Sequence, residues 1–188
     1  SMITSFIGQG INSFTKLQPI LMSILISMSF SIIIISPIST VAIGLAIGLT
    51  GTSSAAAGMG VASAAALLVW ASARVNKPGV PLAIGLGGMK MMMPNFLTNP
   101  VMGIPVALTA AISSLTVPLL NMMGTPASAG FGFVGLVSPL AALNAGNINV
   151  IMMIVAWLVI PFAVGYAVNK VLCDVLHLYK KEIFTFNG

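Results

Sequence analysis

The sequence predicts an all-α fold: a polytopic membrane helix bundle with about four full spans and two short, re-entrant or broken segments rich in glycine and proline. Only 5% of the 188 residues are charged and 58% are hydrophobic, whereas soluble domains carry roughly 25% charged residues. The mean hydropathy is +1.11. Stretches such as PILMSILISMSFSIIII lack the alternation that a membrane β-barrel needs. Helices, which satisfy their own backbone polar groups, are the remaining solution in lipid.

The first expected element is a short amphipathic helix over residues 2–15. Its apolar side chains recur at helical spacing on one side: Ile3, Phe6, Ile7, Ile11 and Phe14. A helix with one apolar face and few charges typically lies on the membrane surface. The alternative is a frayed terminus.

Two crossings are expected before residue 75. Residues 17–35 carry no charge and are long enough to cross a hydrocarbon core of about 30 Å. Pro37 ends or kinks this span, so the first crossing is kinked. Residues 41–75 are rich in small side chains and include a GxxxG pair, Gly44 and Gly48. Small residues let helix backbones approach closely in lipid, so we expect this region to be buried among helices or at a subunit interface.

The positive charges lie where membrane segments are expected to end, which is typical of the positive-inside bias rather than of nucleic-acid binding. They are Lys16, Arg74, Lys77, Lys170, Lys180 and Lys181. An even number of crossings between them places all these sites on one side. Residues 170–183 are expected to form a second amphipathic surface helix.

The second half of the chain shows a possible internal repeat, 78–123 and 124–169, within a single membrane domain over residues 1–188. A shift of 45 residues superposes four backbone-special positions: Pro81 on Pro126, Gly85 on Gly130, Pro94 on Pro139, and Asn99 on Asn144. In each copy a short segment precedes a full span, Val101 to Met123 or Ile148 to Val168. Paired interrupted segments of this kind indicate the binding site in many transporters. Chance is the alternative, since glycine and proline are abundant here.

The short segment of the first copy cannot cross a bilayer as one helix. Twelve residues separate Pro81 from Pro94, and a helix of that length spans about 18 Å of a core of about 30 Å. A re-entrant or broken helix is therefore expected. Such segments occur where the chain is buried in protein or lines a watery cavity.

The residues that most chemistries need are missing from the predicted membrane segments. The only acids are Asp174 and Glu182, both near the end of the chain, whereas ion-coupled carriers usually place carboxylates within the membrane. There is no P-loop, no Cys/His cluster and no Ser/His/Asp set. We therefore expect no metal, no cofactor and no self-contained catalytic site. Cys173 is expected to pack as a small apolar residue. His177 and Asp174, three residues apart on a surface helix, are expected to be solvated, the alternative being a titrating pair.

Four side chains are candidates for binding a solute: Lys90, Asn95, Asn99 and Asn144. Lys90 is the only charged residue in 78–169. It either faces a cavity, where it binds a solute hydroxyl, a phosphate or a partner backbone carbonyl, or snorkels to the membrane surface. Asparagine amides both donate and accept hydrogen bonds, which suits a polyhydroxylated solute. The alternative for the asparagines is helix capping.

The stretch NKPGVPLAIGLGGMKMMMPN, Asn76 to Asn95, with TNPVMGIP after it, resembles the phosphotransferase-system EIIC-like membrane proteins of type 2. That group includes proteins described as perfringolysin (toxin) regulators. The resemblance implies a multi-span, permease-like and dimeric protein of the bacterial cytoplasmic membrane. It also implies a soluble phosphoryl-transfer partner that phosphorylates a sugar held at membrane depth. Sugar sites of such permeases typically use a glutamate and often a histidine, and this chain has neither within its predicted membrane segments. Members are longer than 188 residues, so the chain resembles a C-terminal portion or a shortened form.

Three functions stay open at this point. The first is a permease that moves a small polar solute by alternating access, energised by phosphorylation in a partner. The second is a membrane sensor or regulator that keeps the permease fold without transport, which the missing glutamate favours. The third is a channel or a structural helix bundle. Paired broken segments have no evident use in a plain bundle, so the permease is preferred.

Overall fold

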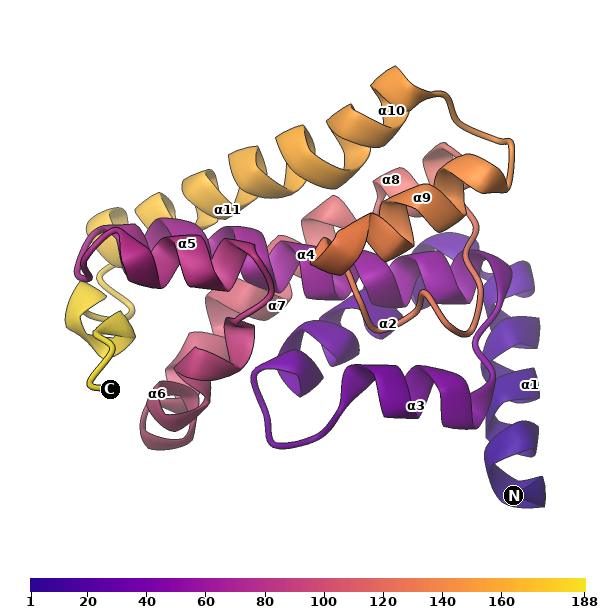
Figure 1. Cartoon of the computed structure of the whole chain (residues 1–188), viewed down its shortest axis with the longest axis horizontal. Coiled ribbons are helices and arrows are strands. Elements are labelled where there is room, and N and C mark those ends of the chain that lie inside the picture. Colours follow the sequence, from indigo (N-terminus) through magenta and orange to yellow (C-terminus); the bar gives the residue numbers. More distant parts are fainter.

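The computed structural model describes residues 1–188 and is all-α, with no β-strand (Figure 1). Its α-helices are α1 Met2–Leu17, α2 Pro19–Ile34, α3 Thr40–Ile47, α4 Gly51–Ala73, α5 Gly79–Gly85, α6 Met93–Thr98, α7 Gly103–Ser113, α8 Thr116–Leu119, α9 Val137–Asn144, α10 Val150–Ile154 and α11 Ile160–Asn169. Short 3-10 turns lie at Met89–Met92, Pro100–Met102, Val134–Leu136 and Lys181–Phe184. Two π-helical turns, Val155–Val159 and Lys170–Val175, continue α10 and α11 into one long helix.

Helix α4 runs through the middle of the molecule, with α2, α7 and α11 packed around it (Figure 1). Of its most apolar 18-residue window, 89% is buried inside the protein. Its sequence is built from glycine, alanine and serine, so neighbouring backbones can come close. The prediction that residues 41–75 are buried among helices is confirmed for α4, whereas the part in α3 is mostly accessible, with Gly44 buried and Gly48 not.

One glycine shows how close this packing is. A Cβ placed on Gly60 would lie 2.1 Å from the backbone oxygen of Ser27 in α2. No side chain larger than hydrogen fits there unless the two helices separate. The α2–α4 contact is therefore a backbone-to-backbone contact that the sequence of α4 makes possible.

Three helices are long and apolar enough to cross a membrane, judged by length and composition: Gly51–Ala73, Pro100–Leu119 and Val150–Val175. The sequence predicted about four. The difference lies in the first apolar stretch, where α2 begins only at Pro19 and ends at Ile34, giving a shorter apolar helix of 16 residues. Pro37 lies in the loop that follows this helix, so of the two predicted effects, ending or kinking the span, the structure shows the first.

The long helix Val150–Val175 covers the outside of the bundle along α4 (Figure 1). Only 22% of its most apolar window is buried, and its exposed side chains include Ile151, Val159 and Val175. Helix α1 also exposes apolar residues, among them Ile3 and Phe6. These surfaces suit lipid, and the surface location of α1 stays a prediction.

Both Gly/Pro-rich segments are broken. The first consists of α5, a 3-10 turn and α6, each of seven residues or fewer. The second runs as turns from residue 124 until the 3-10 turn that leads into α9. The surface helix expected over 170–183 is shorter than predicted. It continues α11 only to Val175, because the backbone reverses at His177, where φ is +50°.

Candidate functional site

The Lys90 side chain is hydrogen-bonded to the protein's own backbone. Its ammonium donates hydrogen bonds to the carbonyl oxygens of Ser36 at 2.6 Å and Ile38 at 2.8 Å, in the loop after α2. These carbonyls follow a helix end, where the last C=O groups lack intrahelical partners, and an ammonium offers three donors. The ammonium therefore contacts backbone carbonyls of its own chain, and its role in a solute site stays a prediction.

Asn95 holds the C-terminal segment. Its amide donates to the carbonyls of Ile183 and Thr185, both at 2.7 Å. Asn76, at the other end of the 76–95 motif, donates to the Phe184 carbonyl at 2.8 Å and accepts from the Phe186 N–H at 2.7 Å. The two asparagines thus fix residues 183–186, and we call this set of hydrogen bonds the tail clasp.

Asn99 follows α6 and its amide donates to the Asn95 carbonyl at 3.3 Å and to the Thr98 hydroxyl at 3.1 Å. The structure therefore brings Asn95 and Asn99 together, while Lys90 and Asn144 have different neighbours. The three residues of the first copy use their donors on backbone or local groups. Asn144 differs from them in this respect.

Asn144, the last residue of α9, lines an open pocket of about 510 Å³. Thr125 and Ser128 supply the other polar side chains, and Gly124 and Gly135 leave room beside them. No hydrogen bond within the protein engages the Asn144 amide or the Thr125 hydroxyl. Both groups are free to bind a solute that donates and accepts hydrogen bonds.

The irregular segment that forms this pocket is held by hydroxyls of neighbouring helices. Gly124 exchanges two backbone hydrogen bonds with Gly51 at the start of α4, at 2.9 and 3.0 Å. The Ser54 hydroxyl donates to the Thr125 carbonyl at 2.6 Å, and the Thr40 hydroxyl donates to the Gly130 carbonyl at 2.8 Å. Non-helical backbone in a membrane protein needs such partners. Ser54 of α4 and Thr40 of α3 therefore help to position the segment that forms the pocket.

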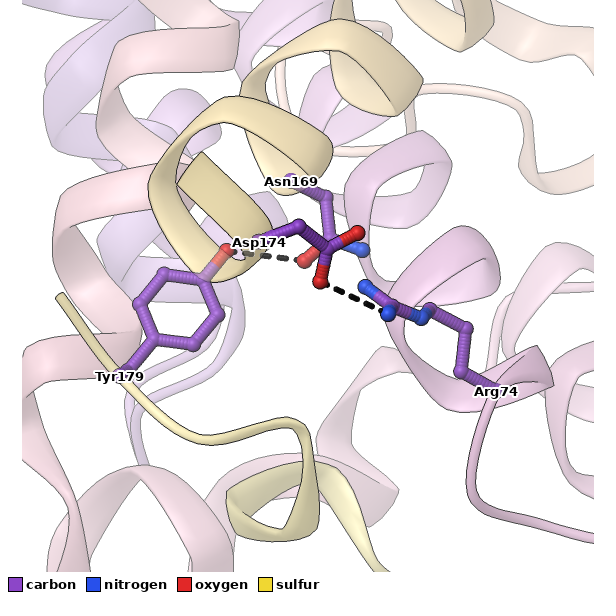
Figure 2. Close-up of polar contacts among 4 residues, drawn as sticks. All are labelled: Arg74, Asn169, Asp174 and Tyr179. Atoms are coloured by element: carbon purple, nitrogen blue, oxygen red, sulfur yellow. Dashed lines mark hydrogen bonds and ion pairs between the residues drawn. The ribbon is translucent and has the colours of Figure 1, made fainter. Parts of the chain in front are cut away.

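A second pocket, of about 460 Å³, lies where the ends of α4 and α11 meet, and we call it the terminal pocket. Its lining includes two aromatic side chains, two cations, one amide and one carboxylate: Trp70, Tyr166, Arg74, Lys170, Asn169 and Asp174. Arg74 donates to Asp174 at 2.8 Å, and the two side chains are 35% and 41% exposed (Figure 2). This hydrogen bond raises the pKa of Arg74.

Asn169 joins the terminal pocket to the tail. Figure 2 shows its side chain between Tyr179 and the Arg74–Asp174 pair. The Tyr179 hydroxyl donates to the Asn169 Oδ1 at 2.8 Å. Burial raises the pKa of Tyr179, so this hydroxyl remains a donor. Asp174 is paired with Arg74, a contact that the sequence did not predict.

Sequence reasoning treated Arg74 and Lys170 only as markers of helix ends. Two signals identify the pocket in retrospect. Trp70 and Arg74 are spaced i, i+4 at the end of one span, and Tyr166 and Lys170 have the same spacing near the end of another. Residues at this spacing share a helix face. Their meeting across the two helices depends on tertiary packing.

A comparison with family models matches residues 1–186 to the family described as phosphotransferase system, EIIC. The chain belongs to this family. The resemblance of the 76–95 motif is thereby confirmed over almost the whole chain. Searches of curated proteins and of solved structures each gave no match. Membership together with several apolar helices identifies an EIIC-like membrane protein, and the family as a whole works with phosphoryl-transfer partners.

Proposed function

We propose that this EIIC-family chain is a permease that moves a small polar solute, a sugar being the class that the family favours, by alternating access in the bacterial cytoplasmic membrane. The observation that carries the proposal is the pocket at Asn144. It combines a free amide and a free hydroxyl with an irregular backbone segment, and it lies where the sequence places the second broken segment. Amides and hydroxyls that both donate and accept suit a polyhydroxylated solute.

In this proposal α2 serves as a fourth crossing and the two broken segments, 79–98 and 124–144, enter the membrane without crossing it. The repeat 78–123 and 124–169 assigns them corresponding roles. Both copies place a 3-10 turn and then a short helix ending near an asparagine, Asn99 or Asn144. The first copy has become structural through Lys90 and the tail clasp, and the second binds the solute. The functional unit is a homodimer, and a soluble phosphoryl-transfer partner supplies the energy.

Uptake of labelled sugars into vesicles, with and without phosphoryl-transfer proteins, tests the proposal. Asn144→Ala with Thr125→Val should raise the half-saturating sugar concentration about tenfold or more, since two hydrogen bonds are lost. Asn99→Ala is the matched control, because it removes the same side chain from the corresponding position outside the pocket. Unchanged uptake in the double variant contradicts the site. Absence of uptake by wild-type protein contradicts transport and favours the membrane regulator.

A second measurement distinguishes a structural role of Lys90 from a role in solute binding. Lys90→Met removes two hydrogen bonds to the α2–α3 loop. It is expected to lower thermal stability in detergent while leaving the half-saturating sugar concentration of the folded fraction unchanged. A changed sugar dependence with unchanged stability would return Lys90 to the solute site.

A further inference from the structure

The terminal pocket contains a buried polar group that the fold does not use. Asn169 is 4% exposed, and every other buried polar side chain in the protein is a serine or threonine. Its Oδ1 accepts from Tyr179, but its Nδ2 donates no hydrogen bond within the protein. The Asn169 Nδ2 is not among the side-chain atoms that are both fully buried and unpaired, so it is accessible from the pocket. The Tyr179 bond turns the two N–H donors of the amide away from the tail, on the side where Asn169 lines the pocket (Figure 2).

The other donors of the terminal pocket are cations. Arg74 carries five N–H donors in a planar fork, and its hydrogen bond to Asp174 uses one nitrogen. Lys170 lies 5.8 Å from the centre of the Tyr166 ring and forms no ion pair. Two cations against one carboxylate give the pocket a net positive charge. Donors of this kind, with a guanidinium among them, recognise phosphate oxygens.

The position of the terminal pocket indicates the source of the phosphate. It lies at the ends of two helices of spanning length, Gly51–Ala73 and Val150–Val175. Trp70 and Tyr166 pack edge to face at 5.2 Å beside it, and such residues mark the headgroup level of a bilayer. Exposed apolar side chains, Val155 and Val159, lie along the outer helix on the membrane side of the pocket. Acyl chains can lie there while a headgroup occupies the pocket.

We propose that the terminal pocket binds the phosphate of an anionic phospholipid, with Arg74, Lys170 and the Asn169 amide as donors. Asp174 accepts from a hydroxyl of the headgroup, which selects phosphatidylglycerol over headgroups without a donor. Basic pockets between membrane helices bind anionic headgroups elsewhere. The bound lipid joins the end of α4 to the end of the outer helix and so stabilises the contact that closes the bundle on this side.

Trp70 reports on the site directly because it lines the pocket. The chain has two tryptophans, and Trp157 is 1% exposed with an indole N–H that lacks an acceptor. A Trp157→Phe background leaves Trp70 as the single tryptophan and removes no hydrogen bond. Quenching by brominated phosphatidylglycerol or brominated phosphatidylcholine, in mixed vesicles, measures the relative affinity of the two lipids at Trp70.

We expect phosphatidylglycerol to be preferred about fivefold to tenfold, since each surface cation attracts an anionic lipid by about 1 kcal/mol. Lys170→Gln should reduce the preference about fivefold, and Asn169→Asp, which replaces donors by a carboxylate, should abolish it. Lys77→Gln is the matched control: it removes an exposed cation from the same end of α4 but outside the pocket. Circular dichroism verifies the fold of each variant.

Two results would overturn the proposal. One is an equal response of the preference to Lys77→Gln and Lys170→Gln, which indicates a diffuse surface charge. The other is equal quenching of Trp70 by the two brominated lipids, together with a change in Trp70 fluorescence on addition of inorganic phosphate but not of chloride at equal ionic strength. That result contradicts the lipid and assigns the pocket to soluble phosphate.

Discussion

Helix α4 and the long helix Val150–Val175 are both long enough to cross a bilayer, yet one is 89% buried and the other 22% over its most apolar window. The buried helix is the one with the smaller side chains, and the exposed helix has the larger aliphatic ones. In water the order would be reversed, because burial of large apolar surface stabilises a soluble fold. In lipid the buried helix is the one whose small side chains let neighbouring backbones come close, and we call this the sorting rule. Large aliphatic residues on α4 would separate the helices, whereas on the outer helix they meet acyl chains.

Among the substitutions that test this comparison, Gly60→Leu has the largest expected effect on stability. The new side chain would overlap the Ser27 backbone, so α2 and α4 must separate. We expect a loss of about 3 kcal/mol in the free energy of unfolding, measured by denaturant titration in detergent micelles. Ala163→Leu on the exposed face of α11 is the control and should be near neutral. Equal effects of the two substitutions would contradict the sorting rule.

A smaller effect is expected at the contact between the two compared helices. A Cβ on Gly165 of α11 would lie 3.1 Å from the Leu67 backbone nitrogen of α4. This is tight but leaves more room than at Gly60. Gly165→Leu should therefore cost about 2 kcal/mol, by the same titration. A cost above that of Gly60→Leu would show that the outer helix, not α2, is the more closely packed partner of α4.

Tyr179, at the end where the two helices meet, is expected to make the stability of the fold depend on pH. The Tyr179 pKa is raised by burial, whereas an unfolded tyrosine ionises near pH 10. The stabilisation by neutral Tyr179 is therefore complete below about pH 10 and is lost as the pH rises further, because the unfolded state then releases a proton that the folded state retains. Tyr179→Phe should lose about 1 kcal/mol at neutral pH and show a flatter decline of the melting temperature at alkaline pH. Parallel declines would exclude Tyr179 as the cause.

The smallest effect is expected on the lipid-facing surface. Ile151 is 73% exposed, so Ile151→Ala should change the free energy of unfolding by less than about 0.5 kcal/mol. Leu67→Ala on α4, where the side chain is fully buried, should cost about 3 kcal/mol. If Ile151→Ala is as costly as Leu67→Ala, the outer helix packs against a second copy of the protein rather than lipid.

The sequence predicted those features that depend on neighbouring residues. The small side chains of α4 predicted its burial, and the glycines and prolines of 79–98 predicted a broken segment. The partners of polar groups could not be predicted in this way. Lys90 binds carbonyls 52 and 54 residues away, and Arg74 pairs with Asp174 across 100 residues. Such pairings are set by tertiary packing, which no local pattern encodes.

The tail clasp has a consequence for the timing of biogenesis. Its four hydrogen bonds join Asn76 and Asn95 to residues 183–186, across separations of 88 to 110 residues. Translation proceeds from the N-terminus, so the 76–95 motif enters the bilayer long before its acceptors exist. Until then the Asn95 amide lacks both of its acceptors, whereas Asn76 retains only its hydrogen bond to the Ser72 hydroxyl. The clasp can therefore form only after residues 183–186 have been synthesised.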